Sequence, residues 1–260
     1  MNRNDGVWVY AVTTDDSFLD GISEIRGVAG EELRMVADCD IAAVVGSVDL
    51  DEYGEEALRR NLEDLDWLSE TARRHDAVVS AVCAGGATIP LRLATVYFDD
   101  DRVRAMLCEQ AESFTRVLDR IADRAEWGVR VYGDPHAFTE QSTTAGATGK
   151  PSGTEYLMRR RAQAAARKDA ETIAGGRADD IYAELAKIAV AGTRQPPSPP
   201  SLSPHQAWEI LNATYLVDDR RTREFATAVD DINARLEDVE VLLTGPWPPY
   251  SFTADETSSR

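Results

Sequence analysis

The chain has 260 residues, with 46 acidic side chains against 28 basic ones and a formal net charge of −18 at pH 7. This length allows one large or two modest domains, and the apolar fraction of 43% is typical of globular proteins. No apolar run approaches the ~20 residues of a membrane helix, and the negative charge repels nucleic acids and anionic membranes. We therefore expect a soluble, cytoplasmic protein that binds neither nucleic acid nor membrane.

The first half of the chain mixes strand and helix patterns. β-branched and aromatic residues indicate strands, apolar residues at helical spacing indicate helices, and the aspartates at 99–101 are a typical helix start. The predicted elements are strands at 7–12, 33–37 and 41–48, a helix at 55–74, a strand at 77–83, an extended segment at 89–96 and a helix at 101–125.

The second half resembles a split-βαβ, ferredoxin-like arrangement, since a strand, a helical region, a strand, a helix and a strand follow one another. The predicted elements are a strand at 127–132, a polar loop at 134–153, a helical region at 154–191 interrupted by Gly175 and Gly176, a proline spacer at 194–204, a strand at 209–217, a helix at 219–236 and a strand at 239–243. The expected fold class is α+β, with an N-terminal mixed α+β domain at 1–126. The second domain, at 127–260, is expected to be a modified ferredoxin-like domain that carries an aromatic and proline-rich tail.

Motifs for catalysis, nucleotides or metals are weak. The segment at 146–151, GATGKP, has two residues between its glycines, where a phosphate-binding loop needs four. A proline also follows its lysine in place of Ser or Thr. The three histidines, at 75, 136 and 205, lack the close spacing of metal ligands. We predict no enzyme activity, no cofactor and no metal.

The three cysteines are odd in number, widely spaced and set among apolar residues. This pattern indicates neither a disulfide framework nor a zinc site, so Cys39, Cys83 and Cys108 are expected to be ordinary buried thiols. A Cys83–His75 catalytic dyad can be imagined, but a cysteine at the end of a core strand is the favoured interpretation.

One basic cluster interrupts the acidic chain. It consists of Arg159, Arg160 and Arg161, followed by Arg167 and Lys168. The cluster is either a solvated helix face or a docking patch for an acidic partner, including this protein's own acidic surface.

Three stretches are more particular than composition explains. They are PLRLATVY at 90–97, GTEYLMRR at 153–160 and LTGPWPPYSF at 243–252. Together with the opening strand around Trp8 and Tyr10, they resemble the gas vesicle protein F/L family in order along nearly the whole chain.

This resemblance implies a minor, non-enzymatic protein of the gas vesicle, acting in its assembly or on its gas-facing surface. The implied partners are the major shell protein and other gas vesicle accessory proteins, and the implied location is the gas vesicle within the cytoplasm. The alternative is a small-molecule-binding or catalytic protein built on a ferredoxin-like domain, which fold alone does not exclude.

The same stretches supply the candidate partner-binding residues, because exposed aromatic and arginine side chains are common interface anchors. The tail either folds back on its own domain or contacts a partner, and Arg92 is expected to be buried beside a carboxylate rather than to clamp a substrate. The candidates are Arg92, Tyr156, Arg159, Arg160, Trp247, Tyr250 and Phe252.

Overall fold

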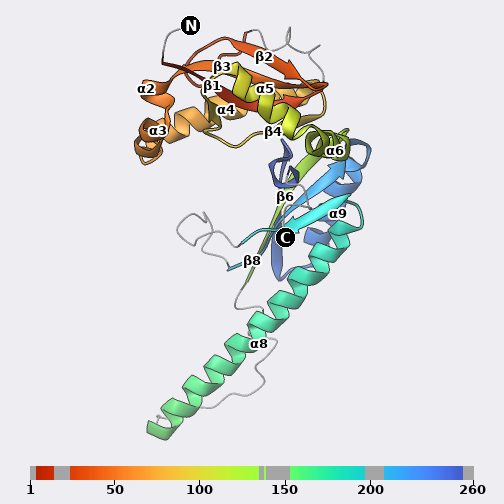
Figure 1. The fold of residues 1–260 in the computed structure, drawn as a ribbon. Helices are drawn as coiled ribbons and strands as arrows, with labels where there is room; N and C mark the ends of the chain where they lie inside the picture. Colours follow the sequence, from red (N-terminus) through yellow and green to blue (C-terminus); the bar gives the residue numbers. More distant parts are fainter. Residues whose placement is uncertain (1–3, 15–23, 135–137, 139–152, 197–207, 254–260) are drawn as a thin grey trace. The chain divides into compact units, whose positions relative to one another are not determined.

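The computed structural model describes residues 4–14, 24–134, 138, 153–196 and 208–253. The protein is a mixed α+β protein with two sheets and several helices, as predicted (Figure 1). The chain divides into two compact units. The first unit consists of residues 1–126 with 246–260, and the second of residues 127–245. The tail that the sequence analysis assigned to the second half thus groups with the first unit.

The first unit is built on an antiparallel sheet with the order β2-β3-β1-β4, in which β5 also pairs with β1. Its central strand, β1, is buried at every position from Val7 to Thr13, so both faces of the sheet are covered. The predicted strands at 7–12, 33–37 and 41–48 correspond to the first three strands. The strands are β1 (Asp5–Thr13), β2 (Leu33–Asp38), β3 (Ile41–Asp49), β4 (Thr88–Pro90) and β5 (Val96–Tyr97).

Several helices of the first unit begin at aspartates. Asp64 accepts hydrogen bonds from two backbone amides at the start of α4, and Asp99 accepts one from Arg102 N at the start of α5. The helices of the first unit are α2 (Leu50–Tyr53), α3 (Glu55–Asn61), α4 (Leu65–Gly85), α5 (Asp100–Glu109) and α6 (Ala111–Ile121).

The predicted strand at 77–83 is wrong, because these residues form the end of α4. Thr71, His75, Val78 and Val82 recur at helical spacing and are all buried, so one helix face packs against the sheet. A short β-branched run has the composition of a strand but does not by itself distinguish a strand from a buried helix. The predicted helix at 55–74 correspondingly becomes α3 and α4, and the helix at 101–125 divides at Gln110.

The second unit has a sheet with the order β7-β8-β6-β9. Along the chain the order is β6, α8, β7, β8, α9 and β9. Its core joins Val129 and Val131 of β6 to Tyr215 of β8 and Phe225 of α9. The elements are β6 (Arg124–Gly133), α8 (Gly153–Ala186), β7 (Ala191–Arg194), β8 (Trp208–Asp218), the 3-10 turn η1 (Asp219–Arg221), α9 (Thr222–Arg235) and β9 (Val239–Trp247).

The expected interruption of the helical region at Gly175 and Gly176 is wrong, since α8 is continuous. Both glycines are exposed, and a side chain at either would meet nothing within 4 Å. The opposite face carries Ala174, Ala178 and Ile181 into the core, and this packing outweighs the roughly 1 kcal/mol helix penalty of each glycine. Most of the predicted loop at 134–153 and of the proline spacer lies outside the described residues. The first residue of that spacer, Arg194, ends strand β7, which the sequence analysis missed.

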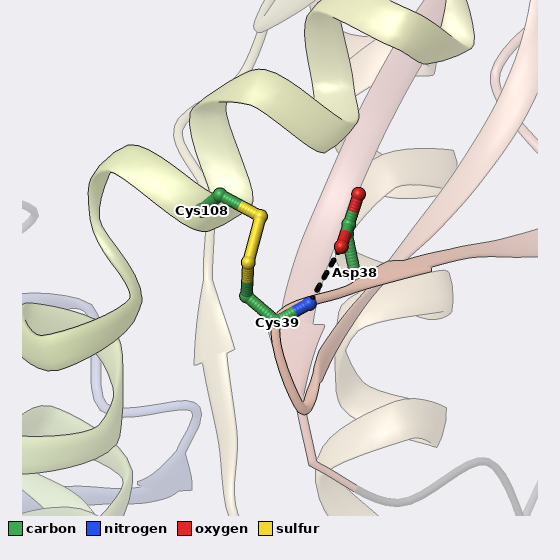
Figure 2. The surroundings of a disulfide bond; sticks show 3 residues. All are labelled: Asp38, Cys39 and Cys108. Carbon is green, nitrogen blue, oxygen red and sulfur yellow. Dashed lines mark hydrogen bonds between the residues drawn. A yellow bond between two sulfur atoms is a disulfide. The ribbon is translucent and has the colours of Figure 1, made fainter.

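The expectation of three buried thiols is also wrong. Cys39 and Cys108 form a disulfide with Cα atoms 5.3 Å apart, and both residues are exposed (Figure 2). Cys39 lies in the turn between β2 and β3, and Cys108 lies in the last turn of α5. Their separation of 69 residues is not a recognisable spacing, because the pairing arises only when α5 packs against β2 and β3.

Two links therefore hold α5 against the β2–β3 hairpin. At the start of the helix, Arg34 of β2 donates two hydrogen bonds to the carboxylate of Asp100, at 2.7 and 3.0 Å. At its end the Cys39–Cys108 disulfide joins the hairpin turn to the helix. A bidentate pair and a covalent bond fix both the position and the direction of α5.

Reducing this disulfide should destabilise the first unit. Closing a loop of 69 residues removes conformational entropy from the unfolded chain, which corresponds to about 4 kcal/mol of stability. Denaturant unfolding with and without a thiol reductant measures the loss. Cys108→Ser should be insensitive to the reductant, whereas Cys83→Ser, which removes a free thiol, should respond as the wild type does. Equal unfolding of the wild type in both conditions would contradict the stabilising role.

Candidate interaction site

The C-terminal tail presents two of its aromatic side chains and buries the third. After β9, Pro248 and Pro249 are buried and lead into the 3-10 turn η2 (Tyr250–Phe252). Phe252 is only 4% exposed, whereas Trp247 is 51% and Tyr250 37% exposed. The tail is therefore docked on the first unit through Phe252, which leaves Trp247 and part of the Tyr250 side chain accessible to a partner.

Glu126 anchors this tail. Its carboxylate accepts a hydrogen bond from Ser251 N at 2.8 Å and another from Ser251 Oγ at 2.7 Å. Glu126 is buried, and this burial raises the pKa of its carboxyl group, an effect that the two hydrogen bonds oppose. Sequence reasoning missed Glu126. The available signal was an acidic residue directly before the predicted strand at 127–132.

Tyr250 lies near α4, which carries Asp76 and Cys83. The pKa of the Tyr250 hydroxyl is raised, mainly by burial and secondarily by the negative charge of Asp76. Burial also raises the pKa of the Cys83 thiol to about 12, so the thiol stays protonated and is a poor nucleophile near neutral pH. His75 bonds elsewhere, so the structure does not assemble a Cys83–His75 dyad.

The segment from Pro90 to Tyr97 is attached to β1 by backbone hydrogen bonds. Leu91 N donates to Tyr10 O and Val9 N donates to Thr95 O, each at 2.9 Å. Thr95 Oγ1 donates to Arg92 O at 2.7 Å, which closes a tight turn. The Arg92 side chain is exposed, so the expectation of a buried arginine is wrong. Its backbone is fixed while its guanidinium group faces solvent.

His75 connects this segment to the core of the first unit. Trp8 Nε1 donates to His75 Nδ1 at 3.0 Å, and His75 Nε2 lies 3.1 Å from Leu91 O. The first bond needs an unprotonated Nδ1 and the second a proton on Nε2, so the neutral tautomer satisfies both. His75 is only 3% exposed, and this burial lowers its pKa.

Tyr10 stacks on the His75 ring, with centroids 5.3 Å apart, and belongs to a second buried polar group. Its hydroxyl donates to Glu31 at 2.5 Å and accepts from Val28 N at 2.8 Å. Side chains at Gly27 or Gly46 would overlap Glu31, so these glycines make room for the carboxylate. His75, Tyr10 and Glu31 all have partners within the chain, as titratable groups with structural roles do.

The remaining candidates lie in the second unit. Tyr156, Arg159 and Arg160 belong to α8, on the N-terminal side of Ala170, which is part of the core cluster. Arg160 is exposed, as are Arg161 and Lys168 of the same cluster. The sequence-predicted residues thus divide between the two units, with Arg92, Trp247, Tyr250 and Phe252 in the first. The glycine segment at 146–151 lies outside the described residues.

These features define a class: a mixed α+β protein with two sheets and a docked aromatic tail. Two solved structures share the fold. The gas vesicle protein GvpF from Anabaena sp. PCC7120 has a TM-score of 0.70 at 17% identity, covering 97% of each chain. GvpF from Microcystis aeruginosa has a TM-score of 0.66 at 14% identity, covering 96% of this chain and 99% of the other.

Sequence comparison identifies the family. The model of gas vesicle synthesis protein GvpL/GvpF matches residues 6–254. Gas vesicle protein L from Streptomyces sp. (strain CB03234) is 41% identical over 94% of this chain and 91% of its own length. Gas vesicle protein F from the same strain is 27% identical over 73% of this chain and 80% of its own length. The chain belongs to the GvpL/GvpF family and takes part in gas vesicle formation, which confirms the resemblance found in the sequence.

The family consists of gas vesicle structural and accessory proteins. Along the described ranges, no helix combines the length and apolar character that a membrane span requires.

Acidification should destabilise the first unit through His75. The folded state lowers the pKa of His75 below its ordinary value of 6.5, so the unfolded chain binds the proton more readily. This contribution to the free energy of unfolding is complete above pH 6.5 and is lost as pH falls towards the folded pKa. Denaturant unfolding at a series of pH values between 7.5 and 5.5 measures the slope. His75→Gln keeps a donor and an acceptor but does not titrate, so it should show a flatter slope; an equally steep slope would contradict the assignment.

Removing the Glu126 anchor should release the tail. Glu126→Ala leaves the Ser251 amide without its acceptor, which should cost about 1–3 kcal/mol and speed chymotryptic cleavage after Tyr250 and Phe252. Limited proteolysis and denaturant unfolding measure both effects. Ser251→Ala is the matched variant, because it removes the hydroxyl bond but keeps the amide bond, and it should have the smaller effect. Equal effects of the two substitutions would show that the amide bond does not hold the tail.

Proposed function

We propose that this protein acts in gas vesicle assembly or nucleation by binding the major shell protein through its aromatic tail. The observation that carries the proposal is the exposure of Trp247 and Tyr250 on a tail that Phe252 and the Glu126–Ser251 bonds hold in place. Trp and Tyr are favoured anchors of protein interfaces because each buries a large surface at a small entropic cost.

The tail is also rigid before any partner arrives. Proline fixes its own backbone torsion, and Pro246, Pro248 and Pro249 flank the exposed Trp247. A segment that is already ordered loses little conformational entropy on binding, so more of the contact energy contributes to affinity. This supports a role for the tail as a preformed binding element.

The net charge of the protein supports a role in keeping the shell protein dispersed during assembly. A strongly hydrophobic shell subunit tends to self-associate, and a companion with a net charge of −18 would keep the bound subunit dispersed by electrostatic repulsion. We further propose that the protein is retained on the gas-facing surface of the finished vesicle. Its presence on washed, intact vesicles would support this location, and its complete loss on washing would contradict it.

For the second unit, we propose a modified ferredoxin-like domain. The chain order β6-α8-β7-β8-α9-β9 follows the split-βαβ pattern, and the sheet order places the first and third of these strands side by side. This assignment concerns the fold and implies no activity.

Substitution of Trp247 tests the proposed surface. Trp247→Ala should weaken binding of the major shell protein by at least about tenfold, since interface hot spots contribute 2 kcal/mol or more. Co-purification and titration of the purified shell protein measure the affinity, and flotation of cells that carry the variant reports on vesicle formation. Phe98→Ala is the matched control, because Phe98 is another exposed aromatic residue of the first unit, at 74% exposure, and lies outside the tail.

Three outcomes would contradict the proposal. The first is that the wild-type protein neither binds the shell protein nor delays its aggregation, as followed by light scattering. The second is that Trp247→Ala and Phe98→Ala weaken binding equally, which would assign binding to general hydrophobicity rather than to the tail. The third is a clear thermal stabilisation by a nucleotide or metabolite, which would favour the small-molecule-binding alternative.

A further inference from the structure

The turn between β2 and β3 contains a cysteine that turn chemistry does not favour. Asp38 pairs with Ile41, so only Cys39 and Asp40 form the loop. Both have positive φ angles, 53° and 62°, which is the backbone of a type I′ turn. Asn and Gly are the favoured residues there, so a cysteine at this position is better explained by what its sulfur does.

Three potential ligand groups meet beside this turn. A carboxylate oxygen of Asp38 and the Sγ atoms of Cys39 and Cys108 all lie within 4.8 Å of one another, and all three residues are exposed (Figure 2). Asp38 Oδ1 accepts a hydrogen bond from Cys39 N at 2.9 Å, which orients the carboxylate. Oδ2 takes no part in this bond.

A disulfide requires only the two sulfur atoms, whereas the carboxylate beside them suits a cation. Two thiolates and one carboxylate carry three negative charges, and sulfur with oxygen is a donor set that Zn²⁺ accepts in four-coordinate sites. We propose that, when Cys39 and Cys108 are reduced, these three residues bind a thiophilic divalent cation such as Zn²⁺, with water as the fourth ligand. The site is distinct from the aromatic tail and does not depend on the function proposed above.

The disulfide and the metal site exclude each other, because disulfide sulfurs are not thiolates. A dithiol reductant converts one form to the other by thiol–disulfide exchange. The reductant attacks the Cys39–Cys108 bond, passes through a mixed disulfide and becomes a disulfide itself, while the protein gains two electrons and two protons. Binding of Zn²⁺ then displaces these two thiol protons.

Either closed form ties the hairpin turn to the end of α5. The reduced, metal-free form retains the Arg34–Asp100 pair at the start of that helix as a charged link. Both side chains of this pair are about one-third exposed, so it is a weaker restraint than a covalent or metal link. The three residues therefore act as a clip that oxidation or metal binding closes.

Cobalt binding tests the site. Untagged full-length protein is reduced, freed of reductant without oxygen and titrated with Co²⁺, whose tetrahedral thiolate complexes show a charge-transfer band and visible d–d bands. We expect one equivalent bound, displacement by Zn²⁺, and a rise in the melting temperature of the reduced protein with Zn²⁺. The disulfide form should give no such bands.

Single substitutions separate the three ligands. Cys39→Ser and Cys108→Ser should abolish the charge-transfer band, and Cys83→Ser, which changes the remaining thiol, should bind as the wild type does. Asp38→Asn keeps an acceptor for Cys39 N but loses the charge, and should weaken binding by at least about tenfold while the disulfide still forms. Circular dichroism of each variant confirms folding.

The proposal would be overturned by any of three results: no tetrahedral spectrum from the reduced wild type, a spectrum that survives Cys39→Ser, or equal affinity of Asp38→Asn and the wild type. The second result would indicate adventitious binding elsewhere on the acidic surface. The third would remove the carboxylate from the site.

Discussion

The hydrogen bond from Trp8 to His75 is the interaction on which the first unit depends. Trp8 lies on β1, which pairs with β3, β4 and β5, and His75 lies on the helix face that covers this strand. The other ring nitrogen of His75 bonds to Leu91 O, so one side chain joins the central strand β1, helix α4 and the segment from Pro90 to Tyr97. Both nitrogens are satisfied at once only in the neutral tautomer that carries its proton on Nε2, and burial maintains the neutral state by lowering the pKa of His75.

The sequence predicted the features that local pattern determines. β-branched and aromatic runs located β1, β2 and β3, and apolar spacing located α9 with its buried Phe225, Val229 and Ile232. The errors arose where distant packing decides. The residues at the end of α4 have a strand-like composition. They form a helix because their apolar face packs against the sheet.

Candidate residues were predicted less well, for the same reason. The aromatic tail was recognisable because its residues are adjacent, whereas Glu126 and Ser251 are 125 positions apart and Cys39 and Cys108 are 69 apart. Exposure was also misjudged. Arg92 lies between apolar neighbours in the sequence, but its segment turns at Thr95 and leaves the guanidinium group in solvent.

The first unit consists of residues 1–126 and 246–260, so the second unit is inserted within it along the chain. During synthesis, Glu126 emerges long before Ser251, and its carboxylate has no tail to bind until Ser251 has been synthesised. A chain that stops before Ser251 therefore lacks the bonds that anchor the tail. The aromatic side chains of Trp247 and Tyr250 can therefore take their anchored position only after the whole second unit has been synthesised.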